Sequence, residues 1–448
     1  MAWFTCGATG VSSRYNASHS CIRVPLFAAK ELSSLMRSKH QCSFTTRVEL
    51  LTVIKTFAAS AMLMLIFDVT CLGQEDDNKF RNQLSLKAAF TTEDFSALDQ
   101  GRRVVKLLPV VDKREVAICG VVPLHGSPPE IAKTFQHTMA QLNAKSLLAS
   151  GRFRDPPSLA DVETLTLENR DIEDLRECVV GDCKLKLSAG MIGRFQTEVD
   201  WNGADYRVQA TSVFRKMLVE YVRDYLARGT LALIAYSDQD PTVQVYDEQK
   251  SLLQSLVYIN DFAPEFAAYL RDFPSTKRAD VHDVVTWTKI KFGLKPVIFI
   301  THVATYQPAT DGPRKVLIVS RQIYANHYFD SSLTLSVALH LPTTDDSLKG
   351  YLLYANHTRA DALDGSFSKL KRSIARTEAE RSLTTLLDQT RVNIEVNAIN
   401  KSQPKQTSNQ QRIVEFLFGG RRLLLWLVGI LLVSLLIKSR VNFRFIRA

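Results

Sequence analysis

The sequence lacks the short motifs by which common catalytic sites are recognised. It contains no nucleophile elbow, Walker loop, dinucleotide-binding fingerprint or zinc-protease helix. It also has neither a CxxC nor an HxxxH pair, although a zinc site needs about four ligands at set spacings. Catalytic triads recur without a fixed sequence, so an enzyme is not excluded. We predict no catalytic residues, no metal and no cofactor.

The body of the chain also lacks net charge, although the whole chain carries +10. Residues 1–73 contribute +4 and residues 421–448 contribute +6. Residues 74–420 therefore carry 43 basic and 43 acidic side chains. Because the basicity lies at the two ends, it indicates membrane-directed segments rather than a nucleic-acid partner.

No apolar run in the N-terminal part reaches the roughly 20 residues that a spanning helix needs. The run Phe57–Phe67 has 11 residues, follows Arg47 and Lys55, and precedes a small-residue exit at Cys71-Leu72-Gly73. This order is typical of a secretory signal peptide, so residues 47–73 are predicted to be a signal peptide or a retained signal anchor. Residues 1–46 do not fit such a leader, and we interpret them as an over-extended start.

The C-terminal apolar run, Leu423–Ile437, has 15 uncharged residues and covers roughly 22 Å as a helix. Flanking basic side chains lengthen its reach by snorkelling, and four of the six basic residues follow the run. We therefore predict that residues 421–448 form a transmembrane helix with a cytoplasmic basic tail. The partner of residues 423–437 is then the lipid bilayer, and the main domain is extracytoplasmic, in the periplasm or at the cell surface.

Cysteine is scarce, with seven residues in the chain. Cys178 and Cys183 stand five apart around a Gly-Asp turn, and in an exported chain such a pair can form a local disulfide. Two buried thiols, or a metal or redox role, are the alternatives.

Residues 103–395 are predicted to form one α+β domain. Runs rich in β-branched and aromatic residues, separated by turn residues, predict strands in the first and last thirds of this range, and residues 187–292 are interpreted as a helical insertion. In that insertion Val213, Met217, Tyr221 and Tyr225 form an apolar stripe, read as core or as a ligand wall. A long amphipathic helix is expected over 367–394, followed by a linker at 396–420. Its expected buried side consists of Leu370, Ile374, Leu383, Leu386, Leu387 and Ile394.

This element order resembles the helix-grip arrangement of START-like lipid-binding domains, over about residues 103–187 and 295–395. The resemblance implies an antiparallel sheet covered by the long C-terminal helix over an apolar cavity. The segments RECVVGDCKLKL, KPVIFITHVATYQP and RQIYANHYFD are in addition similar to an uncharacterised family of exported, membrane-anchored bacterial proteins. That second resemblance implies no activity.

Candidate ligand-binding residues follow from strand periodicity. His302, Ala304 and Tyr306 are expected on one face of a strand, and Tyr324 and Tyr328 on one face of the next. Such a polar-tipped face suits a pocket, and it equally suits the solvent face of a sheet. We therefore carry two function hypotheses, with an unrecognised enzyme as the third. The first is a membrane-anchored extracytoplasmic protein that binds a hydrophobic ligand or lipid. The second is an envelope structural or interaction protein without a ligand.

Overall fold

The computed structural model describes residues 78–256, 259–260, 263–275, 277–308, 315–341 and 349–402. The predicted start at 1–46, the signal segment 47–73 and the span 421–448 lie outside these residues, as does most of the linker 396–420. Among the described helices, none combines the length and the apolar character needed to cross a membrane.

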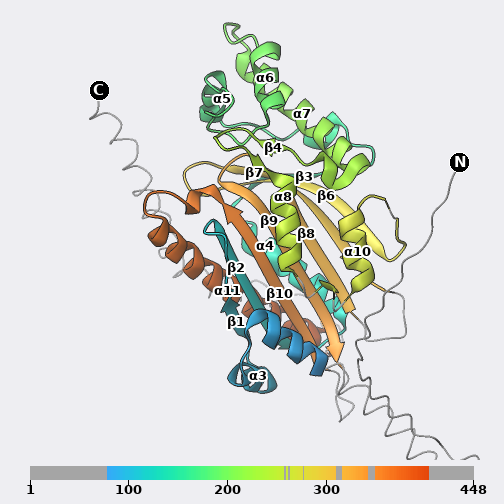
Figure 1. Ribbon diagram of the computed structural model, residues 1–448. Coiled ribbons are helices and arrows are strands. Elements are labelled where there is room, and N and C mark those ends of the chain that lie inside the picture. Colours follow the sequence, from blue (N-terminus) through green and yellow to red (C-terminus); the bar gives the residue numbers. More distant parts are fainter. Residues whose placement is uncertain are drawn as a thin grey trace, which may run out of the picture. The chain divides into compact units, whose positions relative to one another are not determined.

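The core of the fold is an antiparallel sheet of eight strands in the described residues, with the order β1-β2-β10-β9-β8-β7-β6-β3 (Figure 1). The strands are β1 (Val104–Leu107), β2 (Glu115–Leu124), β3 (Leu147–Arg152), β6 (Val281–Ile290), β7 (Val297–Tyr306), β8 (Lys315–Ala325), β9 (Phe329–Leu341) and β10 (Lys349–Ala360). The predicted α+β class with a large antiparallel sheet is confirmed.

One face of the sheet is covered by two helices, α4 (Pro128–Asn143) and α11 (Ser368–Ser402). Ser127 caps α4 through a reciprocal pairing with Glu130, and Pro128 suits its first turn. The helix α11 presents Leu383, Leu386 and Leu387 to β2 at helical spacing, as the sequence predicts. Leu370, expected on the same buried side, is instead 45% exposed near the start of the helix. The helix continues beyond 394, so the first residues of the predicted linker are helical.

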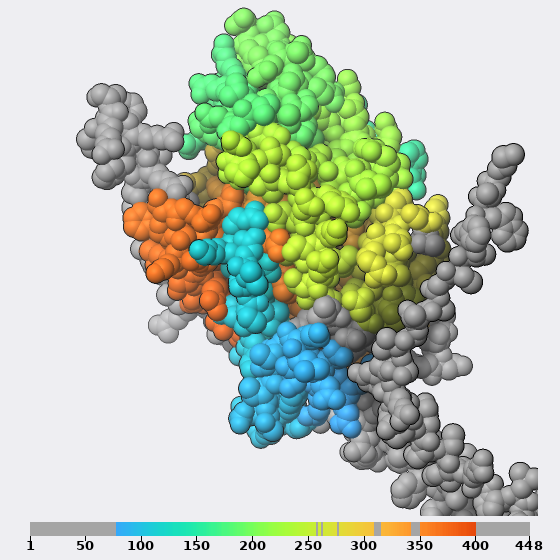
Figure 2. Space-filling model, in the orientation of Figure 1, coloured from blue at the N-terminus to red at the C-terminus, as the bar shows by residue number. Residues whose placement is uncertain are grey.

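The other face carries a layer of helices (Figure 1). The layer comprises a helix over 78–88, α3 (Thr92–Asp99), α7 (Tyr206–Arg228), α8 (Val245–Ser255) and α10 (Pro264–Asp272). Two further helices, α5 (Asn169–Arg176) and α6 (Ala189–Glu198), pack on α7 beyond the end of the sheet (Figure 1). Short turns at Leu159–Val162, Gly229–Ala232 and Asp361–Leu363 and a two-stranded ribbon of Ala235–Tyr236 and Val243–Gln244 complete the described elements. Figure 2 shows side chains of this layer, in green and yellow-green, covering strands of the sheet. The sheet is thus packed on both faces.

The helical insertion differs from its predicted bounds of 187–292. The chain leaves the sheet after β3 at Arg152 and returns at Val281, and β3 pairs with β6. Residues 281–290, expected to be helical, form β6 because Val285, Trp287 and Lys289 alternate with less buried neighbours. That period of two is the pattern of a strand.

Candidate functional site

Two of the four predicted ligand-binding residues share a strand face, as predicted. His302 and Tyr306 lie on β7 and point towards the helical layer together with Ala304. Tyr324 on β8 reaches the same layer, because an irregularity between Gln322 and Tyr324 shifts the alternation of the strand. Tyr328 lies in the β8–β9 turn with φ +61°. The expected shared face of Tyr324 and Tyr328 is therefore interrupted.

His302 is the centre of a buried hydrogen-bonded series. The Tyr225 hydroxyl of α7 lies 2.8 Å from His302 Nδ1, and His302 Nε2 lies 2.9 Å from Asp283 Oδ1 on β6. A neutral imidazole protonated at Nε2 satisfies both contacts, with Tyr225 donating and Asp283 accepting. Tyr269 of α10 also donates to Asp283. Residues far apart in sequence thus meet in one carboxylate–imidazole–phenol series.

The buried surroundings of this series shift the pKa values of its members. Burial lowers the pKa of His302 below 6.5, Arg321 acts in the same direction, and Asp283 opposes them. Burial opposes ionisation of Asp283, yet hydrogen bonds from His302 and Tyr269 hold its pKa below 3.8. Burial also raises the pKa of Tyr225. The resting state is a neutral imidazole beside a carboxylate.

Arg321 adds an unusual buried cation beside this series. Its Nη2 donates to the Leu270 carbonyl at 2.9 Å, while Nε and Nη1 are buried without a hydrogen-bond partner.

A carboxylate, an imidazole and a phenol in line can transfer a proton. Tyr225 is 0% exposed and His302 is 2% exposed, so a substrate would have to displace packed side chains. The arrangement, as it stands, is a polar part of the core.

The other predicted residues make separate contacts. Tyr306 donates to Glu265 of α10 and stacks on Phe266, with 5.0 Å between ring centroids. The Tyr324 hydroxyl donates to the Lys186 carbonyl at 3.1 Å. Tyr328 packs against Phe292 at 5.8 Å. The four residues do not converge on one space, and their role in ligand binding remains a prediction.

The pKa of His302 predicts a pH dependence. The unfolded chain takes up a proton near pH 6.5, whereas the folded chain resists it, so the free energy of unfolding should fall as the pH drops below 6.5. His302→Gln should remove this pH-dependent contribution to the free energy of unfolding, which is at most about 1.4 kcal/mol for each pH unit. Urea denaturation at about pH 7.5 and about pH 5.5 measures it. The exposed neighbour His282→Gln is the control, and equal pH dependence in both variants would contradict the assignment.

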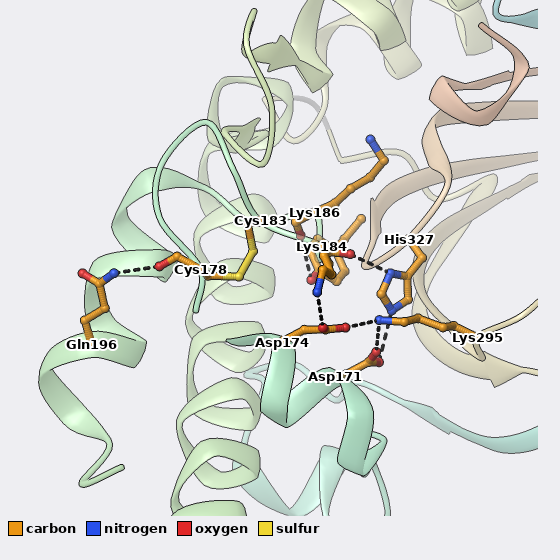
Figure 3. The surroundings of a disulfide bond; sticks show 10 residues. Asp171, Asp174, Cys178, Cys183, Lys184, Lys186, Gln196, Lys295 and His327 are labelled. Atoms are coloured by element: carbon orange, nitrogen blue, oxygen red, sulfur yellow. Dashed lines mark hydrogen bonds and ion pairs between the residues drawn. A yellow bond between two sulfur atoms is a disulfide. The ribbon is translucent and has the colours of Figure 1, made fainter. Parts of the chain in front are cut away.

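The disulfide predicted between Cys178 and Cys183 is present, with Cα atoms 4.5 Å apart (Figure 3). It closes the turn after α5, and Gln196 of α6 donates to the Cys178 carbonyl at 2.7 Å. Nearby, Asp171 of α5 accepts from Lys295 at 2.9 Å and lies 3.1 Å from His327 Nε2. Asp174 accepts from Lys184 at 2.9 Å. The disulfide and these pairs together fix α5 against the β8–β9 turn.

We expect Cys178 and Cys183 to be oxidised in exported protein, and peptide mapping without reductant checks this directly. Closing so short a loop should stabilise the fold by roughly 2–3 kcal/mol in the chain-entropy model. Cys178→Ser/Cys183→Ser should therefore lower the free energy of unfolding by that amount in urea denaturation. Cys119→Ser, at a buried free thiol, is the comparison. Two freely alkylated thiols at 178 and 183 would refute the prediction.

A further charged cluster, which we call the Lys186 cluster, joins the insertion to the sheet. Lys186 Nζ lies 2.8 Å from Asp330 on β9, 2.9 Å from Asp361 and 3.9 Å from Asp238. Arg114 contacts Asp330 at 2.8 Å. Burial opposes the charge of Lys186, but the carboxylates outweigh it and raise its pKa. Burial raises the pKa of Asp330 and of Asp238.

Sequence reasoning missed most of these partners. Asp283 was assigned to a helix, so its place opposite β7 went unseen, and the Lys186 cluster joins residues from 114 to 361. The alternation of β6 was the available signal for Asp283. Pairing between distant segments leaves no comparable signal in one sequence. No protein-family model, curated protein or solved structure matches the chain.

Proposed function

We propose that the chain is a non-catalytic interaction protein of a cell envelope. In this proposal residues 423–437 anchor it in the bilayer and residues 78–402 form a binding domain outside. The disulfide supports an exported location, because such bonds persist in oxidising compartments. The resemblance to exported, membrane-anchored bacterial proteins belongs to this proposal, whereas the helix-grip resemblance enters it only for the order of the elements.

The close packing of α11 on the sheet carries the proposal. In a helix-grip domain the apolar ligand lies between the sheet and the long helix. Here a Cβ added to Gly120 of β2 would meet Leu383 and Leu387 of α11 at 2.9 Å. The chain's own side chains thus occupy that position. On the other face Trp287, Tyr225, Tyr236 and Tyr324 are all exposed by less than 2%.

Native mass spectrometry of the full chain, solubilised and incubated with a lipid extract, tests this proposal. We expect the mass of the chain alone once detergent has been removed in the gas phase. Gly120→Ala is the companion variant, since it narrows the interface further and should leave the spectrum unchanged. A stoichiometric lipid that survives in the parent and is lost in Gly120→Ala would overturn the proposal. It would instead support a hydrophobic ligand under α11.

A further inference from the structure

Two separate clefts lined by basic residues lie where α11 meets the edge strand β1. Their volumes are about 420 and 380 Å³. The first is lined by Arg102, Arg103, Val105, Thr384 and Arg391. The second is lined by Leu107, Lys369, Arg372, Ser373, Arg376, Thr377 and Glu380. We call this set of residues the basic groove.

The residues of the basic groove form one line because of their spacing. Those on α11 recur at intervals of three, four and seven residues from Lys369 to Arg391, which places them on one side of the helix. At 1.5 Å per residue the line is about 33 Å long. Val105 and Leu107, two apart on β1, provide its apolar edge.

The charge of the basic groove is strongly unbalanced. Six of its side chains are cationic, and Glu380 is the single acidic member. Asp388 neutralises Arg103 at 2.8 Å. Within the described residues, Arg102, Arg376 and Arg391 have no carboxylate within 4.0 Å, and Arg391 Nη2 is buried without a hydrogen-bond partner. The Arg102 guanidinium donates to the Gln100 side-chain oxygen at 2.9 Å.

The accumulation of positive charge at the start of α11 is energetically unfavourable when no anion is bound. Lys369, Arg372 and Arg376 lie in its first turns, where the helix dipole is already positive, and its first turn contains no acidic residue. A bound anion would relieve this repulsion. Guanidinium groups present paired donors that match phosphate oxygens, and the hydroxyls of Ser373 and Thr377 add further donors.

We propose that the basic groove binds a linear polyanion with repeating phosphate groups. A linear occupant fits because the cations follow a line and lie in clefts, whereas a flat bilayer would meet only projecting charges. The inference rests on the proposed function in treating residues 78–402 as a binding domain, and it names the chemical class of its partner.

Binding of fluorescently labelled inorganic polyphosphate to the full chain in neutral detergent tests the proposal. Arg102→Gln/Arg376→Gln/Arg391→Gln removes three groove charges without leaving a carboxylate unpaired. The matched control, Arg170→Gln/Arg176→Gln/Arg271→Gln, removes three exposed charges from other elements, none of which has an ion-pair partner among the described residues. We expect the groove variant to weaken binding about tenfold or more and to reduce its salt dependence. The control should change the affinity less than about twofold, because charges away from the binding site contribute little at moderate salt.

Equal effects of the two triple variants would overturn the proposal, because binding would then follow total charge, the basic tail included. Absence of binding by the parent would overturn it too. Phosphatidylglycerol vesicles are a competitor in the same assay. If they displace the labelled polyphosphate as effectively as unlabelled polyphosphate does, per accessible phosphate, the groove binds a membrane surface and the proposal is replaced. A retained lipid in mass spectrometry would overturn the proposed function but would not alter this comparison of variants.

Discussion

Lys186→Met should lower the free energy of unfolding by about 3–5 kcal/mol at neutral pH. Lys186 is 2% exposed, and its ammonium is shared by Asp330, Asp361 and Asp238. Methionine fills a similar volume but leaves these carboxylates with Arg114 as the remaining cation near Asp330. Removing one partner of a buried pair is costly because the other charge stays desolvated. Urea denaturation of the full chain measures the difference.

The difference in the free energy of unfolding between the parent and Lys186→Met should become smaller as the pH falls. Burial raises the folded-state pKa of Asp330 and of Asp238 above 3.8, so protonation of these groups favours the folded state. Their favourable contribution is complete below 3.8 and is lost as the pH rises through the folded-state values. Without Lys186 those pKa values rise further, so the variant regains stability at a higher pH than the parent.

Lys186→Met/Asp330→Asn serves as the control, since it removes the cation and its 0% exposed partner together. We expect the double variant to be more stable than Lys186→Met, because the most deeply buried of the three uncompensated carboxylates is gone. A stability of Lys186→Met equal to that of the parent at neutral pH would show that the cluster is not buried in the folded chain.

Local periodicity predicted the parts of this fold that depend on one segment at a time. The spacing of Leu383, Leu386 and Leu387 predicted α11, and the stripe containing Tyr221 and Tyr225 predicted the buried side of α7. The five-residue separation of Cys178 and Cys183 predicted their bond. In each case the relevant partners lie within about one helix or one turn of sequence.

Features that depend on distant segments were not predictable in the same way. The first strand pair continues into β10, so that Glu115 meets Arg359 across the sheet. A single sequence carries no direct record of such pairing. Segment 74–101 is polar in the sequence, which favours loose order, yet its described part forms helices whose Phe80, Leu84 and Leu98 are buried in the core. Sparse apolar residues suffice where the rest of the fold supplies the surface that they contact.

The same limit applies to the candidate site. Strand periodicity placed His302 and Tyr306 on one face, but their partners Asp283 and Glu265 come from β6 and α10. The basic groove escaped notice because its residues alternate along α11 with the buried leucines and join β1 only after folding. Its charge imbalance is local, whereas residues 74–420 as a whole are neutral.

Leu387→Asp should abolish folding, and Leu387→Ala should lower the free energy of unfolding by about 2–5 kcal/mol. Leu387 is 0% exposed and packs with Leu383 against Gly120 of β2. Truncation leaves a cavity between helix and sheet, while an unpaired carboxylate at that position would lose its hydration without gaining a partner. Leu386, at 9% exposure, should respond in the same direction.

Val392→Asp is the matched control, because Val392 lies on the same helix and is 47% exposed. A substitution there should change the free energy of unfolding by no more than about 0.5 kcal/mol. Circular dichroism reports whether each variant folds, and urea denaturation reports its stability.

If Leu387→Asp has the same stability as the parent, α11 is not packed on the sheet in solution. The closed helix–sheet interface on which the proposed function rests would then be absent. The basic groove between α11 and β1 would lose one of its two walls. If Leu387→Asp fails to fold while Val392→Asp is unaffected, the interface under α11 is filled by the chain itself.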